Sequence, residues 1–248
     1  MTDCKIACTV RRSVTRVLLL MFALSHTQLG ASEFSDAETA LWLTDQLNTV
    51  HEPMVFTYKF ERNGSYDADF QDTVRFIVTK VKEDGMKSAS VEFFTGVRRV
   101  DVPPVESTNV NPILKIYLQG DVYEMNRLTD ADGNSRERWR YFQRKIKLAM
   151  AESASVEKTS IRYEGSDYRA QIISFVPFVG DKKLNDSAQR PAEMRALYQG
   201  LANKSYRVVV SEELPGFLFR IETIVPGYDQ GDPPLIHETL QLIETSRP

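Results

Sequence analysis

Alternating apolar and polar positions recur along most of the chain and predict an antiparallel sheet. Val74, Phe76 and Val78 alternate with polar residues, which is typical of a strand with one buried and one solvent-exposed face. Turn residues at 63–64 and 83–85 separate such segments at the spacing of hairpins. The predicted strands are 54–61, 70–82, 88–95, 160–164, 167–176, 205–212, 217–225 and 235–243.

Two further segments have the periodicity of amphipathic helices. Ser35 and Glu38 have the spacing of a capping box, and a helix to about Val50 places Ala40, Leu43, Leu47 and Val50 on one face. Pro191 fits the first turn of a second helix, which carries Met194, Leu197, Tyr198 and Leu201. The order of these elements predicts an α+β fold with one large antiparallel sheet that is curved around a helical plug.

The stretch 111–151 interrupts the strands, and its first half admits two interpretations. If Asn111 caps a helix and Pro112 occupies its first turn, Asp121 lies on an apolar stripe with Leu114, Tyr117, Leu118, Met125 and Leu128. A carboxylate on that stripe needs a cation or several donors, and we expect Arg140 or Arg144 to neutralise it. The alternative is a hairpin that turns at Gly120 and Asp121, since a glycine inside a helix costs about 1 kcal/mol.

The second half of this stretch predicts a helix with two chemically different surfaces. One face carries Trp139, Phe142, Ile146 and Ala149, and the flank beside it carries Arg136, Arg140, Arg144 and Lys147. An aromatic face bordered by guanidinium groups suits an anionic amphiphile, such as a phospholipid or an acylated protein, and transient contact with a membrane surface. The alternative is a core-packing helix with a solvated basic edge.

The first 31 residues have the pattern of a signal peptide. Basic residues at 5, 11, 12 and 16 precede an apolar run at 17–24, and small residues at 30 and 31 suit cleavage. We therefore expect a periplasmic protein, cleaved near Ala31, with a single α+β domain over residues 32–248. The apolar run is shorter than the roughly 20 residues of a spanning helix, and no later segment approaches that length.

Composition argues against several classes of function. Cys4 and Cys8 both lie in the leader, so the mature chain has no thiol for a disulfide, a metal site or a nucleophile. Without the leader the chain has 27 basic and 33 acidic side chains, a net charge of −6, which with export argues against nucleic acid as a partner. His51 and His237 lack metal-ligand spacing, and no catalytic motif is complete. We expect no metal, no cofactor and no catalytic residue.

The beginning of the mature chain resembles a known family. Leu43-x-x-x-Leu47 in the first helix is followed at once by Val55-Phe56-Thr57-Tyr58-Lys59-Phe60, then by a meander and a helical insertion. This layout is similar to that of the outer-membrane lipoprotein carriers LolA and LolB and their relatives. The resemblance implies a curved antiparallel half-barrel that is covered by helices and holds acyl chains in an apolar cavity. The central block is larger and more basic than is expected of a lipoprotein carrier, which leaves the ligand open.

Two functions are consistent with these patterns. The first is a non-catalytic carrier of an apolar or anionic amphiphilic ligand, for which the candidate binding residues are Asp121, Arg136, Trp139, Arg140, Phe142 and Arg144. The second is an envelope hydrolase that acts on peptidoglycan or polysaccharide through carboxylates such as Asp67 and Asp69. A cavity between sheet and helices favours the carrier, and a polar cleft lined by paired acids favours the hydrolase. The sequence sets no oligomeric state.

Overall fold

A computed structural model describes residues 34–129, 138–185, 192–229 and 231–248. The strands are β1 Met54–Asn63, β2 Phe70–Val81, β3 Lys87–Phe93, β4 Val105–Thr108, β5 Ser155–Tyr163, β6 Ser166–Phe175, β7 Ser205–Val210, β8 Leu218–Val225 and β9 Ile236–Ser246. The helices are α1 Asp36–Glu38, the π-helical turn η1 Thr39–Leu43, the 3-10 turn η2 Gly96–Arg98, α2 Ile113–Thr129, α3 Arg138–Glu152, α4 Lys182–Asn185 and α5 Ala192–Ala202.

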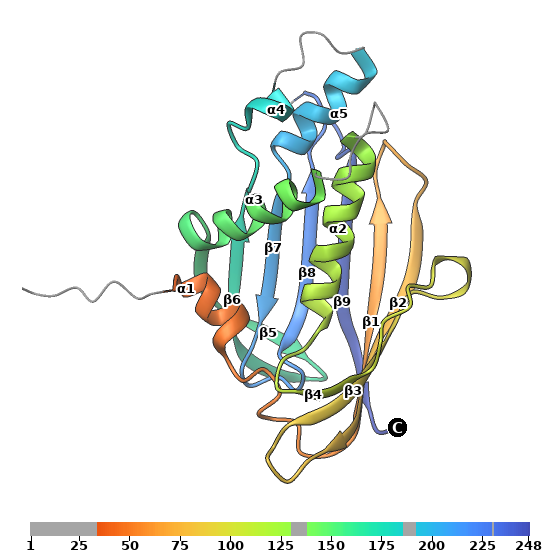
Figure 1. The fold of residues 1–248 in the computed structure, drawn as a ribbon, viewed down its shortest axis with the longest axis vertical. Helices are drawn as coiled ribbons and strands as arrows, with labels where there is room; N and C mark the ends of the chain where they lie inside the picture. The colour runs from red at the N-terminus through yellow and green to blue at the C-terminus, as the bar shows by residue number, and fades with distance from the viewer. Residues whose placement is uncertain (1–33, 130–137, 186–191, 230) are drawn as a thin grey trace, which may run out of the picture. The chain divides into compact units, whose positions relative to one another are not determined.

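These strands form one open antiparallel sheet (Figure 1). Their order is β4-β3-β2-β1-β9-β8-β7-β6-β5, so β4 and β5 are the outer strands. Two meanders, β1 to β4 and β5 to β9, join where the last strand pairs with the first and sets Phe60 opposite Leu240. Helices lie against this curved sheet (Figure 1), and the expected α+β fold is confirmed.

The core fills the space between the sheet and the helices. α2 runs along the central strands and α3 runs across the strand direction, while α4 and α5 lie at one end of the sheet (Figure 1). Alternate residues of β1 and β2 point into this core, and the rings of Phe56 and Phe76 stack at 5.5 Å. Buried side chains of β1, β2 and α2 include Phe56, Tyr58, Phe60, Val74, Phe76, Val78, Ile113, Leu114, Tyr117 and Met125.

The predicted strands are confirmed, with shifts of a few residues at their ends and a longer β5, but the first helix is shorter than expected. The capping box of Ser35 and Glu38 is present, yet the helix ends at Leu43, which is exposed. Gln46 explains the early end, because its amide nitrogen donates to the Leu41 carbonyl and its amide oxygen accepts from the Asn111 backbone. These contacts draw the chain toward α2, so a helix to Val50 was the wrong prediction. The strand β4 and the short helix α4 lie in segments that we expected to be loops.

Residues 113–129 are helical, so the hairpin interpretation is wrong. Asn111 caps α2 as expected, since its Oδ1 accepts from the Ile113 N–H at 3.0 Å. Its Nδ2 donates to the Tyr58 hydroxyl at 3.0 Å and to the Gly216 carbonyl at 2.8 Å. Gly216 has a φ of +78°, and a Cβ on it would overlap the Phe56 ring, so only glycine allows this close approach. The start of α2 is thereby fixed to strand β1 and to the turn between β7 and β8.

Asp121, in the middle of α2, is neutralised by a residue that the sequence did not indicate. Its carboxylate accepts from the Lys204 ammonium and from the Tyr206 hydroxyl, and all three side chains are buried. Burial and the nearby Asp121 charge hold the pKa of Tyr206 well above its ordinary value, so the hydroxyl remains a donor. The expectation that Arg140 or Arg144 pairs with Asp121 is wrong, because both arginines lie on the exposed side of α3.

We predict that Asp121→Ala lowers the free energy of unfolding by about 3–5 kcal/mol, because it leaves the Lys204 ammonium buried without a counter-charge. Urea denaturation measures the loss. In the double variant Asp121→Leu with Lys204→Met, both charges are absent, and we expect a smaller loss than in Asp121→Ala alone. A loss below about 1 kcal/mol in the single variant would contradict the buried ion pair.

Candidate functional site

Two helices face each other along matching stripes on their surfaces. The stripe on α2 is Lys115, Leu118, Gln119 and Val122, and the stripe on α3 is Gln143, Ile146, Lys147 and Met150. Each stripe has the spacing i, i+3, i+4, i+7 of neighbours on one helical face. Each also lies at the boundary between the buried and the exposed side, because it combines apolar side chains with polar ones. Where the two stripes meet, their apolar side chains therefore form an apolar surface, and their polar side chains lie along its edge.

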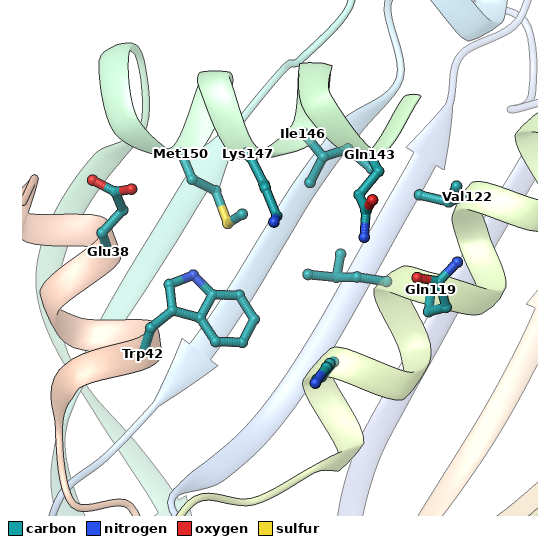
Figure 2. Close-up of a pocket in the computed structure, with 10 residues that line it drawn as sticks. Glu38, Trp42, Gln119, Val122, Gln143, Ile146, Lys147 and Met150 are labelled. Carbon is teal, nitrogen blue, oxygen red and sulfur yellow. The ribbon is translucent and has the colours of Figure 1, made fainter. Parts of the chain in front are cut away.

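The third wall comes from the N-terminal helical turns. Trp42 of η1 and Glu38 of α1 face α3 across the gap (Figure 2). The Ser35 hydroxyl donates to the Met150 carbonyl at 3.0 Å, which attaches α1 to the last turns of α3. The three walls enclose a cavity of about 470 Å³, within the range of small-molecule sites. We call this cavity the helix-layer pocket; no described strand residue lines it.

The charges around the helix-layer pocket are mostly positive. Lys115 and Lys147 are exposed, and Figure 2 shows Lys147 and Gln143 pointing from α3 into the space between Trp42 and α2. Glu38 supplies the one carboxylate in the described lining, and its Oε2 already accepts from the Ser35 N–H at 3.1 Å. An apolar cavity with two amines at its edge suits the chain and head of an amphiphile better than acid–base chemistry.

Three of the site residues predicted from the sequence lie on α3 without lining this pocket. Trp139 is half-buried against the core, and the guanidinium of Arg140 lies 5.3 Å from its ring. Arg144 is exposed. The aromatic and basic groups are therefore adjacent, as the helical spacing indicates, and ligand binding by them stays a prediction.

The remaining predicted residues have other surroundings. Phe142 is 2% exposed and packs edge-on against Phe178 at 5.7 Å, which is the contact of a core residue. Asp121 is enclosed with Lys204 beneath α2, and Arg136 lies outside the described residues. Trp42, Lys115 and Met150 line the pocket although the sequence patterns did not indicate them as site residues. Each of them lies at the boundary between the buried and the exposed side of its helix. This position identifies a pocket residue only when it is known which helices face each other.

Acidic side chains gather at a different place, around Arg62 of β1. Its guanidinium contacts Glu124 of α2 at 3.0 Å, Glu238 of β9 at 3.2 Å and Asp67 at 3.6 Å. Glu238 also accepts from the Tyr117 hydroxyl at 3.0 Å. Burial raises the pKa of Glu238, whereas hydrogen bonds from Arg127 and Arg62 outweigh burial and hold the pKa of Glu124 below its ordinary value. A carboxyl with a raised pKa is a candidate acid, but here neighbouring side chains already occupy its oxygens.

The paired acids that the sequence offers for a hydrolase, Asp67 and Asp69, do not line the helix-layer pocket. Asp67 and Asp69 are exposed in the connection between β1 and β2, where Asp69 accepts from the Gly64 N–H. No group of three or more metal-binding side chains is found among the residues that the structure describes. In the same residues, no helix combines the length and apolar character needed to cross a bilayer.

Comparison with known proteins gives one structural likeness. No protein-family model and no curated protein matches the chain. Among solved structures, the chain is similar to a LolA superfamily protein, NE2245, from Nitrosomonas europaea. The two share 8% sequence identity, with 86% of this chain and 93% of that chain covered and a TM-score of 0.25.

We predict that Glu238→Gln changes how stability depends on pH. Because the pKa of Glu238 is raised in the folded state, its contribution is fully present below the unfolded pKa near 4.5 and is lost as pH rises through the folded pKa. Wild-type protein should therefore gain stability relative to Glu238→Gln as pH falls from 8 toward about 4.5. Urea denaturation of both proteins across this range provides the test. Glu124, whose pKa is also shifted, is present in both proteins, so the comparison isolates the substitution at Glu238. A difference that stays constant or shrinks toward acid pH contradicts the raised pKa.

Proposed function

We propose that this protein is an exported carrier that binds an apolar or amphiphilic ligand, a lipid or an acyl chain, in the helix-layer pocket. The observation that carries the proposal is the apolar wall of that pocket, formed by Trp42, Leu118, Val122, Ile146 and Met150. Burying a ligand methylene against such a wall contributes about 0.8 kcal/mol, so a long chain gains affinity without any specific polar contact.

The construction of the pocket supports reversible binding. Its α2 wall is held to the sheet by Asn111 and Asp121, so that wall is preformed. Its N-terminal wall is a short turn with Trp42 36% exposed, attached to α3 by the Ser35–Met150 hydrogen bond. A rigid wall lowers the entropy lost on binding, and a partly exposed indole at the opposite wall leaves a path for entry and release. A carrier needs both properties.

We also propose that this protein acts in the periplasm. The N-terminal pattern of basic residues, apolar run and small residues supports export to the periplasm with cleavage near Ala31. In that compartment the ligands at hand are membrane lipids, fatty acids and acylated proteins. Transient contact with a membrane surface fits a carrier that loads there.

We predict that the Trp42 fluorescence reports binding. The chain has only two tryptophans, so Trp139→Phe leaves Trp42 in the pocket and Trp42→Phe leaves Trp139 outside it. Adding a monomeric acyl-chain ligand should shift the Trp42 emission of Trp139→Phe to shorter wavelength, because the chain displaces water from the indole. The emission of Trp42→Phe should change little. Equal responses from the two variants, or none from Trp139→Phe, would remove the support for the pocket as binding site.

A larger side chain in the pocket should block this response. Val122→Phe adds volume to the cavity wall, and Gln143→Phe does so from a half-buried position that tolerates substitution more easily. Val97→Phe makes the same change as Val122→Phe at a fully exposed residue and is the matched control. In the Trp139→Phe background, both pocket variants should weaken binding at least tenfold, with circular dichroism unchanged, while the control binds normally. Full binding by both pocket variants counts against the assignment.

We predict that the mature protein starts close to Ser32 and is found in the periplasm of a Gram-negative bacterial host. The expected cleavage follows from the small residues at positions 30 and 31. Intact-mass measurement on protein from the envelope fraction gives the first residue directly. Recovery of the full-length chain from the cytosol contradicts export, and a variant with Arg11, Arg12 and Arg16 replaced by Glu provides the matched block of export.

A further inference from the structure

The size of the helix-layer pocket limits what it holds. Its volume is about 470 Å³. A group of the size of water or methylene occupies about 30 Å³ in a liquid, so the pocket has room for roughly fifteen such groups. This is one acyl chain of ordinary length. A second acyl chain of the same length would need about twice this volume.

The rim of the pocket limits the chemistry of the head. Lys115 and Lys147 approach from opposite helices, and neither forms an ion pair with a described residue. Two other cations of α2 and α3 are engaged in ion pairs: Arg127 pairs with Glu124 at 2.8 Å, and Lys145 pairs with Asp181 at 2.8 Å. The two pocket lysines therefore keep their charge available. Glu38, the one acid among the described lining residues, accepts from the Ser35 N–H in the capping box.

The mouth of the pocket also provides hydrogen-bond donors. Gln119 and Gln143 line it beside the two lysines, and each carries a side-chain amide. Carboxylate and phosphate oxygens accept from ammonium and amide groups together. A ligand head of this kind would sit at the level of Lys115 and Lys147 while its chain follows the apolar wall toward Met150.

We infer that the ligand of this pocket is a single-chain anionic amphiphile, with a long-chain fatty acid as its simplest member. Lys115 and Lys147 recognise the carboxylate, and the wall of Leu118, Val122, Ile146 and Met150 holds one chain. This inference rests on the proposed carrier function and narrows it. It assigns head recognition to the two pocket lysines and not to Arg140 and Arg144, because only the lysines line the pocket.

The experiment compares tetradecanoate with 1-tetradecanol, which has the same chain and no charge. Both are titrated below their aggregation concentrations into the Trp139→Phe protein, with Trp42 emission as the readout. We expect tetradecanoate to bind at least tenfold more tightly at low salt. The advantage should shrink in 1 M NaCl, where the Debye length falls to about 3 Å. Equal affinities at every salt concentration overturn the inference and leave the carrier function standing, whereas the absence of binding by either compound overturns both.

Matched charge variants locate the head group. Lys115→Gln with Lys147→Gln should lower the affinity for tetradecanoate to that for tetradecanol and leave the alcohol unaffected. Arg140→Gln with Arg144→Gln removes the same number of charges from exposed positions outside the pocket and should leave the preference intact. Because all four side chains are exposed, both double variants should fold normally. Loss of the preference in the arginine variant alone places the head at α3 and overturns the assignment to the lysines.

A chain-length series tests the single-chain size. Each added methylene should raise the affinity of a saturated fatty acid by up to about fourfold while it is buried in the pocket. The rise should end near fifteen carbons, where roughly 470 Å³ is filled at about 30 Å³ per group. A dimyristoyl phosphatidylglycerol vesicle, which offers an anionic head with two chains, should produce a weaker response than tetradecanoate. A stronger response to the two-chain lipid, or a rise that continues beyond twenty carbons, overturns the single-chain assignment.

Discussion

The position of α2 on the sheet depends on polar side chains that are buried beneath it. Asn111 binds Tyr58 and the Gly216 carbonyl, Tyr117 binds Glu238, and Asp121 binds Lys204 and Tyr206. A buried ion pair such as Asp121–Lys204 contributes little net stability, because the desolvation of two charges offsets most of their attraction. A misplaced helix, however, would bury these groups without partners, and each would then cost several kcal/mol. The polar contacts thus fix the rotation and the height of α2 more narrowly than the burial of its apolar residues alone does.

The helix-layer pocket follows from that selection. A rotation of α2 by about 100°, the angle between successive residues, would move Leu118 and Val122 away from α3. The pocket would then lose its apolar wall on α2. The second wall is positioned from both of its ends. Ser35 binds the Met150 carbonyl near the end of α3, and Tyr141 and Lys145 near its beginning and middle bind Asp181 at the start of α4. The pocket is therefore a property of how the helices are held, and the sheet serves as the rigid base that holds them.

Much of the fold could be predicted from the sequence because its signals are local. The alternation in β2, the turn residues after β1 and the capping box at Ser35 each act over a few residues, and each was found where expected. The failures involve contacts between distant parts of the chain. Gln46 ends the first helix early by binding Asn111, which is 65 residues away, and Asp121 pairs with Lys204, which is 83 residues away. Sequence periodicity shows that Asp121 faces inward, but it does not show which cation the fold brings to it.

The same distinction explains the site. Periodicity identified α3 as an amphipathic helix with Trp139 and Phe142 on its apolar face. The carrier hypothesis placed the ligand on that face. In the structure the Phe142 side chain is buried and packs against Phe178. Other core side chains therefore already cover the most apolar part of this helix. A residue that is fully apolar and central on its helix is thus a poor candidate for contacting an exchangeable ligand. The better candidates lie at the boundary of the apolar face, as Ile146 and Leu118 do, because each lines the helix-layer pocket close to an exposed lysine. For a helix-covered sheet, binding in the helix layer then requires no opening of the main core, and exchange can proceed at a free-energy cost well below that of unfolding.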